Sequence, residues 1–124
     1  MTTPETITVT RVGAVNLVRM NRPDKKNALT SGMYAAMTAA LQAGEADEGV
    51  AVHVLLGVPG AFSSGNDVAE FAAAAATGTL GMQVIDFLVA LASLEKPLVC
   101  GVDGLAIGIG TTALLHADLV YASD

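Results

Sequence analysis

The sequence predicts an α/β fold, and three observations carry that prediction. Short apolar runs at 50–56 and 98–102, rich in β-branched residues, are typical of interior parallel strands. Each run is followed by a glycine-containing loop and then by a helical pattern. After the second helical pattern, at 111–117, the apolar residues 119–121 indicate a further strand. Residues 96–124 are therefore expected to form a βαβ-like fragment.

The composition limits what the chain can be. It has 124 residues, of which 52% are hydrophobic, and a formal net charge of −6. An acidic chain lacks the broad basic face that phosphate neutralisation requires, so we expect no nucleic-acid partner. No window reaches the roughly 18 uninterrupted apolar residues of a membrane span, so we expect no membrane attachment. The first ten residues show no signal-peptide pattern, and the single cysteine, Cys100, is expected to be an inert buried thiol. Together these features indicate a cytoplasmic protein.

Alternating residues at 7–20 predict a β-hairpin with its turn at Val12-Gly13. The second arm carries more apolar residues than the first and is expected to be the more buried of the two. The residues at 21–24 are typical of a turn, with a proline at a position that suits it.

A helix is predicted over 31–46, where apolar residues recur at helical spacing and Thr30 is a suitable N-cap. The helix ends in acidic residues, which oppose its dipole, so its last turn is expected to fray. His53 lies within the following strand. We expect it to be a packed core residue, because no second ligand or catalytic partner is spaced to work with it.

The second half of the chain adds two more helices. Asp67 is placed to cap an alanine-rich helix over 68–76, and Glu70, three residues later, is close to a capping-box arrangement. Residues 77–79 interrupt the helical pattern. A further helix over 82–94 stops at a Lys-Pro pair, and its apolar stripe is expected to face the core.

Two glycine loops are the candidate functional features. The loops at 57–67 and 104–110 both run from a strand into a helix, at the sheet edge where open α/β folds bind ligands. Glycine lets the backbone approach a ligand closely, and the first N–H groups of a helix lack intrahelical partners. Two such donors converging on one carbonyl oxygen would form an oxyanion hole.

The basic residues are concentrated near the N-terminus. Five of the six lie within the first 26 positions: Arg11, Arg19, Arg22, Lys25 and Lys26. The cluster at 22–26 could hold one small polyphosphate ligand, or it could be a solvated turn.

Two other chemistries find little support. Ser63 and Ser64 lack the Gly-x-Ser-x-Gly pattern of a nucleophile elbow, because Ala61 and Phe62 occupy the positions where glycine is needed. No cysteine, histidine or carboxylate cluster has the spacing of metal ligands, so no metal is expected.

Dinucleotide binding remains an alternative. The stretch GIGTTA at 108–113 matches the permissive Gly-x-Gly-x-x-Gly/Ala pattern after a strand, and Asp124 follows the next strand. Against this alternative, extra residues separate the strand from the motif, and Asp124 falls short of the usual offset of roughly 20 residues.

Three motifs resemble the crotonase superfamily, the enoyl-CoA hydratase/isomerase family. They are NRPDKKNAL at 21–29, GAFSSGNDV at 60–68 and KPLVCGVDGLAIGIGTTALLHADLVYASD at 96–124. The resemblance implies a ClpP/crotonase-type spiral of ββα turns and assembly into trimers or hexamers. It also implies an acyl-CoA thioester as substrate, with no further cofactor.

The resemblance assigns roles to individual residues. The backbone N–H groups of Ser64 and Ile109 would hold the thioester oxygen, and the isoleucine side chain would narrow the pocket. Loop 25–29 and stretch 63–67 would cradle the CoA moiety. The implied substrate- and CoA-binding positions are Lys25, Lys26, Ala28, Ser63, Ser64, Gly65, Asn66, Asp67 and Gly108.

One position departs from the family's hydratases. Thr112 stands where they carry a glutamate, and threonine cannot act as a general base near neutral pH. The surrounding residues are more similar to the Δ3,Δ2-enoyl-CoA isomerase branch, which uses a single glutamate further along the chain. We therefore expect residues 1–124 to be the N-terminal part of one crotonase-like domain, ending before the C-terminal helical region and inactive in isolation.

The expected activity of the parent enzyme is enoyl-CoA isomerisation in fatty-acid metabolism. The alternatives are an enoyl-CoA hydratase, a non-catalytic CoA-binding fragment and a dinucleotide-binding fragment.

Overall fold

The computed structural model describes residues 5–78 and 81–124 of the protein. Its main sheet has five strands in the order β1–β2–β3–β5–β7. The strands are β1 (Ile7–Val12), β2 (Val15–Met20), β3 (Val52–Leu56), β5 (Leu98–Val102) and β7 (Leu119–Ala122). β1 and β2 form the predicted antiparallel hairpin, and the other three strands add in parallel. The predicted α/β class is confirmed, as is the βαβ-like fragment at the end of the chain.

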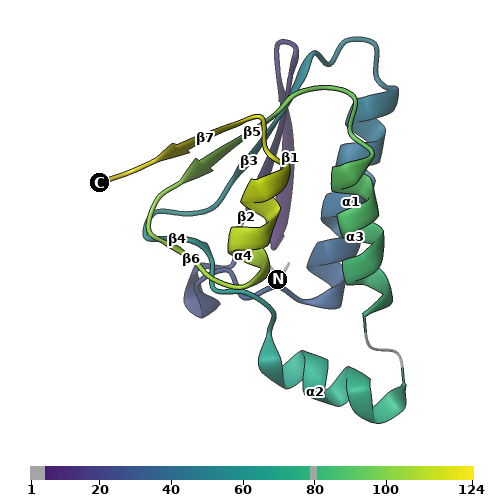
Figure 1. Ribbon diagram of the computed structural model, residues 1–124, viewed down its shortest axis with the longest axis vertical. Coiled ribbons are helices and arrows are strands. Elements are labelled where there is room, and N and C mark those ends of the chain that lie inside the picture. Colours follow the sequence, from purple (N-terminus) through teal and green to yellow (C-terminus); the bar gives the residue numbers. More distant parts are fainter. Residues whose placement is uncertain (1–4, 79–80) are drawn as a thin grey trace.

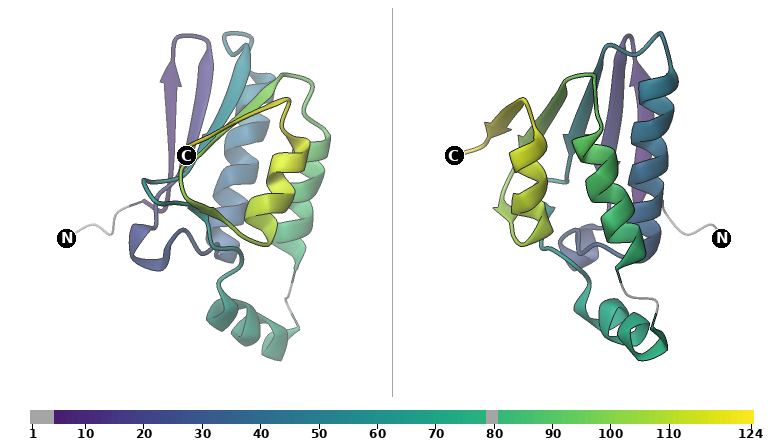
Figure 2. Two further views of the ribbon diagram at one scale, coloured as in Figure 1. Left: turned by 60° about the vertical axis from the view of Figure 1, so that its left-hand side comes forward. Right: turned by 45° about the vertical axis from the view of Figure 1, so that its right-hand side comes forward.

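Two helices lie side by side on one face of this sheet, α1 (Ser31–Ala46) and α3 (Met82–Ala92) (Figures 1 and 2). The helix α2 (Val68–Thr77) projects from one end of the molecule. Short helical turns complete the list: η1 (Pro23–Lys25), α4 (Ile109–Thr112) and η2 (Ala113–His116). The predicted interruption after α2 includes Thr79, which lies outside the described residues.

A second, two-stranded sheet pairs β4 (Ala61–Ser63) with β6 (Leu105–Ala106) in parallel. The sequence predicted only loops at these positions, because each segment is too short to show a strand period. Both segments follow the carboxyl ends of parallel strands, β3 and β5, so they lie at the same edge of the main sheet. This small sheet joins the two glycine loops to each other.

The core lies between the main sheet and the helices α1 and α3. β2 alternates in burial and turns Val18 and Met20 inward, as predicted for the more buried arm of the hairpin. Phe87 and Leu91 bring the apolar stripe of α3 into the same cluster, as expected. Cys100 is fully buried, and burial raises the pKa of its thiol to about 12, so it is an inert core thiol as predicted.

The first helix has the predicted bounds. The Thr30 side chain accepts a hydrogen bond from the backbone N–H of Met33 at 3.2 Å, which caps α1. The hairpin turn, in contrast, lies one residue later than predicted. Val12 still pairs with Val15 as the last strand pair, and Gly13, with φ +58°, begins the turn with Ala14.

The prediction that α1 frays at its end is wrong. Lys96 Nζ donates to the backbone carbonyls of Gly44 at 2.8 Å and Asp47 at 2.6 Å, and so satisfies carbonyls of the last turn. The Glu45 carboxylate accepts from the backbone N–H groups of Glu95 at 3.2 Å and Lys96 at 3.1 Å. These partners lie about 50 residues away in sequence, so no local pattern reveals them.

His53 is the buried core histidine that was predicted. Its Nδ1 lies 2.9 Å from Asn16 Nδ2, and its Nε2 lies 2.9 Å from Glu45 Oε1. The described residues include no group of three or more His, Cys, Asp or Glu side chains that could hold a metal ion. In the same part of the chain, no single helix is long and apolar enough to cross a membrane. Only the sharply bent pair α2–α3 passes that test, by length and composition alone.

Candidate functional site

The two glycine loops meet backbone to backbone. The N–H of Ile107 donates to the carbonyl of Ser63 at 2.9 Å. A Cβ added to Gly104 would lie 2.1 Å from the carbonyl oxygen of Gly60, and one added to Gly65 would lie 3.1 Å from that of Ile107. Because any side chain at Gly104 would clash with backbone, this contact requires glycine. Gly65 and Gly104 therefore allow the two loops to approach each other closely, whereas the sequence predicted a close approach to a ligand.

Within residues 5–78 and 81–124, the backbone donors at this contact that have no hydrogen-bond acceptor include the N–H groups of Asn66 and Ile109. Each follows a glycine at the loop contact, since a Cβ built on Gly108 would lie 3.8 Å from the Cα of Gly65. Ile109 begins α4, where the first N–H of a helix has no intrahelical partner. These two N–H groups therefore belong to residues that each follow one of the two glycines in contact.

Ser64 does not supply the predicted donor. Its backbone N–H donates to the carbonyl of Lys26 at 3.0 Å, and its hydroxyl donates to that of Lys25 at 3.3 Å. An N–H that is already bonded within the protein is not free for a ligand oxygen. The N–H of Ser64 is therefore engaged within the described part of the protein, whereas that of Asn66, two residues later, is not, and Ile109 has the unused N–H that was expected.

Asn27 holds the first glycine loop through side-chain hydrogen bonds. The residue is fully buried and has φ +57°. Its Nδ2 donates to the carbonyls of Met20, Ala61 and Phe62, each at 3.1 Å. Its Oδ1 accepts from the backbone N–H of Arg22 at 2.7 Å. The 21–29 segment therefore has a structural role: the buried Asn27 side chain ties it to β2 and β4 and is not accessible to a ligand. We call this set of bonds the clamp.

Ser63 belongs to the same clamp. It is 0% exposed, its hydroxyl donates to the carbonyl of Asn27 at 2.9 Å, and it accepts from the N–H of Gly65 at 3.1 Å. The predicted contact of Ser63 with CoA is wrong for this conformation, because burial excludes it. The same burial excludes it as an exposed nucleophile.

Asp67 and Glu70 are also engaged within the protein. Asp67 pairs with Arg22 at 2.8 Å and caps α2 by accepting from the N–H of Glu70 at 3.0 Å. The N–H of Glu70 and the guanidinium of Arg22 lower the pKa of the Asp67 carboxyl. Glu70 does not close the predicted capping box. Its carboxylate accepts from the backbone N–H of Ser31 at 2.7 Å and so caps the start of α1 instead.

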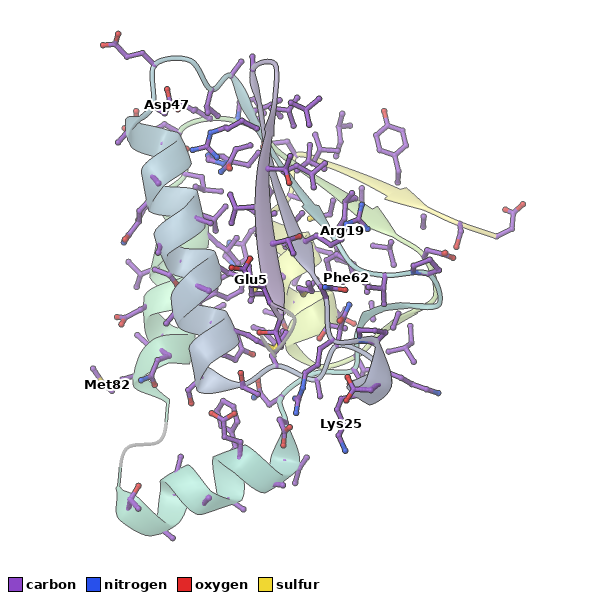
Figure 3. The ribbon with its side chains drawn as sticks, turned by 180° about the vertical axis from the view of Figure 1, so that it is seen from behind. Glu5, Arg19, Lys25, Asp47, Phe62 and Met82 are labelled. Atoms are coloured by element: carbon purple, nitrogen blue, oxygen red, sulfur yellow. The ribbon has the colours of Figure 1, made fainter. Side chains whose placement is uncertain are left out.

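The remaining predicted ligand positions are accessible except Gly65, which is buried against the second glycine loop. Lys25, Lys26, Asn66 and Gly108 are exposed, and Ala28 is half-buried. Figure 3 shows Lys25 projecting outward from the η1 turn, while Phe62 lies in the interior. Two exposed ammonium groups thus stand next to the loop whose backbone carries one of the unused amides.

The start of α4 offers hydroxyls but no base. Thr111 Oγ1 donates to the carbonyl of Ala106 at 2.6 Å, and Thr112 Oγ1 donates to that of Gly108 at 3.3 Å. Both hydroxyls support the second glycine loop. Thr112 cannot take up a proton near neutral pH, so the site can stabilise charge without transferring a proton at this position.

The sequence did not reveal one residue at this site. Tyr34, in α1, is 0% exposed, and its hydroxyl donates to the side-chain oxygen of Asn66. The only local signal was a tyrosine on the apolar face of a predicted helix, where a polar end needs a buried partner. That partner lies 32 residues later in sequence.

The chain is similar to known proteins in both sequence and structure. The family model described as "Enoyl-CoA hydratase/isomerase" matches residues 10–124. Enoyl-CoA delta isomerase 2 of Rattus norvegicus is 37% identical over 123 residues, which is 95% of this chain and 31% of the rat protein. The 2,3-dehydroadipyl-CoA hydratase of Escherichia coli is 31% identical, over 94% of this chain and 46% of that protein.

Among solved structures, OdaA of Pseudomonas aeruginosa superposes with a TM-score of 0.89 at 40% identity, covering 97% of this chain and 48% of that one. An enoyl-CoA hydratase/isomerase of Pseudoalteromonas atlantica superposes with a TM-score of 0.85 at 36% identity, covering 95% of this chain and 46% of that one. The chain thus spans about a third of the rat protein and about half of the other relatives. The chain shares its fold with about half of each of the two solved chains.

Proposed function

The chain belongs to the enoyl-CoA hydratase/isomerase family, and from this premise we propose that its two glycine loops bind an acyl-CoA thioester. The backbone N–H groups of Asn66 and Ile109 hold the thioester carbonyl oxygen. The observation that carries the proposal is that these are two unused amide donors, each following a glycine at the point where the loops touch.

The two donors would stabilise charge on the thioester oxygen. Loss of a proton from C2 of an acyl thioester moves negative charge onto that oxygen as an enolate forms. Fixed N–H groups aimed at the oxygen cost no reorganisation when the charge develops, and removing one such donor typically costs about 2.7–4 kcal/mol. A backbone N–H can donate whatever side chain the residue carries, so both asparagine and isoleucine can supply a donor to the thioester oxygen.

The exposed Lys25 and Lys26 would attract the phosphates of the CoA moiety. They stand on the segment whose carbonyls bond Ser64, two residues before Asn66. A ligand whose carbonyl lies at the loop contact would then carry its phosphates toward these ammonium groups. Such attraction between exposed charges is modest and depends on ionic strength.

For the parent reaction we propose double-bond isomerisation rather than hydration. In it a carboxylate removes the C2 proton of a 3-enoyl thioester and returns a proton at C4, while the oxyanion hole stabilises the dienolate between the two steps. The support is Thr112, a non-basic residue at the position where the family's hydratases carry glutamate. The acid–base group would come from residues other than those at the two loops.

A chimera tests this choice of reaction. Residues 1–124 would replace the matching part of the rat delta isomerase 2, which is 37% identical to them. We expect the chimera to convert 3-enoyl-CoA to 2-enoyl-CoA and to hydrate 2-enoyl-CoA poorly. Efficient hydration without isomerisation would reverse the assignment.

Calorimetric titration of the 124-residue chain tests the binding proposal itself. Octanoyl-CoA is the probe, and NAD, the ligand of the dinucleotide alternative, is the parallel control. We expect heat of binding with octanoyl-CoA alone. Binding of NAD alone would replace the proposal with the dinucleotide alternative, and binding of neither would contradict a site formed by this chain by itself.

Assembly into trimers or hexamers remains a proposal for the whole protein. Its support here is the edge strand β7, in which Leu119, Val120 and Tyr121 are all exposed. Exposed apolar side chains on an edge strand favour association. Sedimentation over a range of concentrations should show association of the chain, and a monomer at every concentration would contradict it.

A further inference from the structure

We propose that Tyr34 is a positioning residue, which fixes the Asn66 amide donor by holding the Asn66 side chain. The proposal rests on the acyl-CoA site described above, because it assigns a purpose to a contact made behind that site. Tyr34 itself would touch no ligand, since it is 0% exposed.

The Tyr34 ring is held from three helices. It is carried by α1, its ring meets Phe71 of α2 edge-on with centroids 6.3 Å apart, and it packs at a tilt against Phe87 of α3 with centroids 5.4 Å apart. Aromatic contacts of this kind restrict ring orientation. The hydroxyl at the end of the ring therefore has a fixed position relative to the core.

That hydroxyl donates to Asn66 Oδ1. Burial raises the pKa of Tyr34, so the hydroxyl keeps its proton and remains a donor at physiological pH. Because Oδ1 is the accepting end of the carboxamide, Nδ2 is the other end, and it has no acceptor among the described residues. The contact thus orients the whole side chain of an otherwise exposed residue.

The backbone around Asn66 is held by a different set of bonds. The N–H of Leu29 donates to the carbonyl of Gly65, and the N–H of Asp67 donates to the carbonyl of Leu29, each at 2.8 Å. In such a parallel bridge the N–H and carbonyl of the central residue face away from the partner strand. The Asn66 N–H is therefore turned away from Leu29.

Two anchors thus act on one residue. Leu29 fixes the peptides on either side of Asn66, and Tyr34 fixes its side chain. Because the peptide group is planar and trans, the bond from the Leu29 N–H to the Gly65 carbonyl already sets the direction of the Asn66 N–H. The side-chain bond adds a further attachment on the Cα side of that peptide, and so limits tilting of the N–H about the bond to Leu29. A donor aimed in advance needs no reordering when a ligand oxygen arrives.

The test uses Tyr34→Phe, which removes the hydroxyl and keeps the ring. Tyr121→Phe is the matched control, because Tyr121 is 67% exposed on β7. In the ligand-free chain, the heteronuclear NOE of the Asn66 side-chain nitrogen should fall in Tyr34→Phe and stay unchanged in Tyr121→Phe. An Asn66 side chain that is equally rigid without the hydroxyl would overturn the proposal.

The second readout is the ratio of affinities for octanoyl-CoA and S-octyl-CoA, a thioether that lacks the carbonyl oxygen. Tyr34→Phe should lower this ratio roughly two- to tenfold, the worth of one hydrogen bond, while leaving thioether affinity unchanged. In an Asn66→Ala background, where the Tyr34 contact no longer exists, the same substitution should change the ratio no further.

The outcomes separate this proposal from the one on which it rests. If neither ligand binds the wild-type chain, acyl-CoA binding fails, and the ligand-free NOE still decides whether Tyr34 orders Asn66. If the wild type binds and Tyr34→Phe keeps the ratio, the positioning role is overturned and the site stands. An equal loss of affinity for both ligands would mean that Tyr34 is only structural, which also overturns the proposal.

Discussion

The two glycine loops share one order of elements, strand, loop and helix start, yet they are held in different ways. The first, at 57–67, is fixed by side chains from elsewhere, chiefly Asn27, Arg22 and Tyr34. The second, at 104–110, is fixed by the neighbouring hydroxyls of Thr111 and Thr112 and by backbone contacts that exist because a side chain is missing, as at Gly104. The position of the Asn66 N–H therefore depends chiefly on polar side chains from distant segments. The position of the Ile109 N–H depends chiefly on the absence of a side chain at Gly104.

Gly104→Ala should have the largest effect, because it disrupts the backbone contact that holds the second glycine loop against the first. The new Cβ would lie 2.1 Å from the carbonyl oxygen of Gly60, and Gly104 has φ +92°. Overpacking and the left-handed backbone together should lower the free energy of unfolding by about 2–5 kcal/mol. Chemical denaturation measures the loss.

Gly60→Ala is the matched control for that substitution. Gly60 has φ +86°, but a Cβ there would meet nothing within 4 Å. It should cost only the backbone contribution, about 1–2 kcal/mol. Equal losses in the two variants would show that the contact between the loops is not what Gly104 protects.

Asn27→Ala should break the first mode of support. It leaves the carbonyls of Met20, Ala61 and Phe62 without their buried donor. Unsatisfied buried groups cost about 1–3 kcal/mol, so we expect a loss near the upper end of that range in thermal or chemical unfolding. Asn21→Ala, which removes a single exposed bond to the carbonyl of Glu5, should lose about 1 kcal/mol or less. Similar losses at both positions would contradict the clamp.

Asp67→Asn tests the charged part of the first loop's support. Asparagine can still cap α2, so the change isolates the ion pair with Arg22. Because the folded protein lowers the pKa of Asp67, the ionised carboxylate stabilises the fold above the unfolded value of about 3.9, and this stabilisation is lost as pH falls through the folded value.

The variant should therefore be less stable at pH 7 by about 0.5–1 kcal/mol and should lose less stability than the wild type below about pH 4. Unfolding free energies at pH 7 and at pH 3 measure both effects. Asp24→Asn, in the exposed η1 turn, is the control. If the unfolding free energies of the wild type and Asp67→Asn fell by the same amount between pH 7 and pH 3, this role of the Asp67–Arg22 pair would be ruled out.

Replacing Lys25 and Lys26 by glutamine should give the smallest effect. Both side chains are exposed, so stability should not change measurably, while affinity for octanoyl-CoA at low salt should fall roughly two- to fivefold. The difference should vanish in high salt. S-octanoyl-pantetheine, which lacks the nucleotide phosphates, should bind wild type and variant alike. A salt-independent loss would mean that the lysines act other than by charge.

Elements with local signals could be predicted from the sequence. The α1 bounds, the hairpin and the parallel strands were predicted because Thr30 and the apolar periods are local signals. The Ile109 N–H was assigned by the family resemblance, and it is unused in the structure because Ile109 begins α4. The family followed from three motifs that can be read directly from the chain.

The errors lie where contacts with distant segments decide the outcome. Whether Ser64 or Asn66 offers its N–H depends on the carbonyl of Lys26, which folding brings to Ser64. Glu70 caps α1 rather than its own helix, and Lys96 closes the end of α1. None of these partners is marked by spacing, because each is a tertiary contact.

The most direct test of the site is the response of individual amides to ligand in a ¹H–¹⁵N spectrum of this chain. On addition of octanoyl-CoA, the amide protons of Asn66 and Ile109 should move downfield as they bond the thioester oxygen, while that of Ser64 stays bonded to Lys26 and moves little. S-octyl-CoA should leave the Asn66 and Ile109 amide protons nearly unmoved. A large shift at Ser64 with none at Asn66 would contradict the assignment of the two donors.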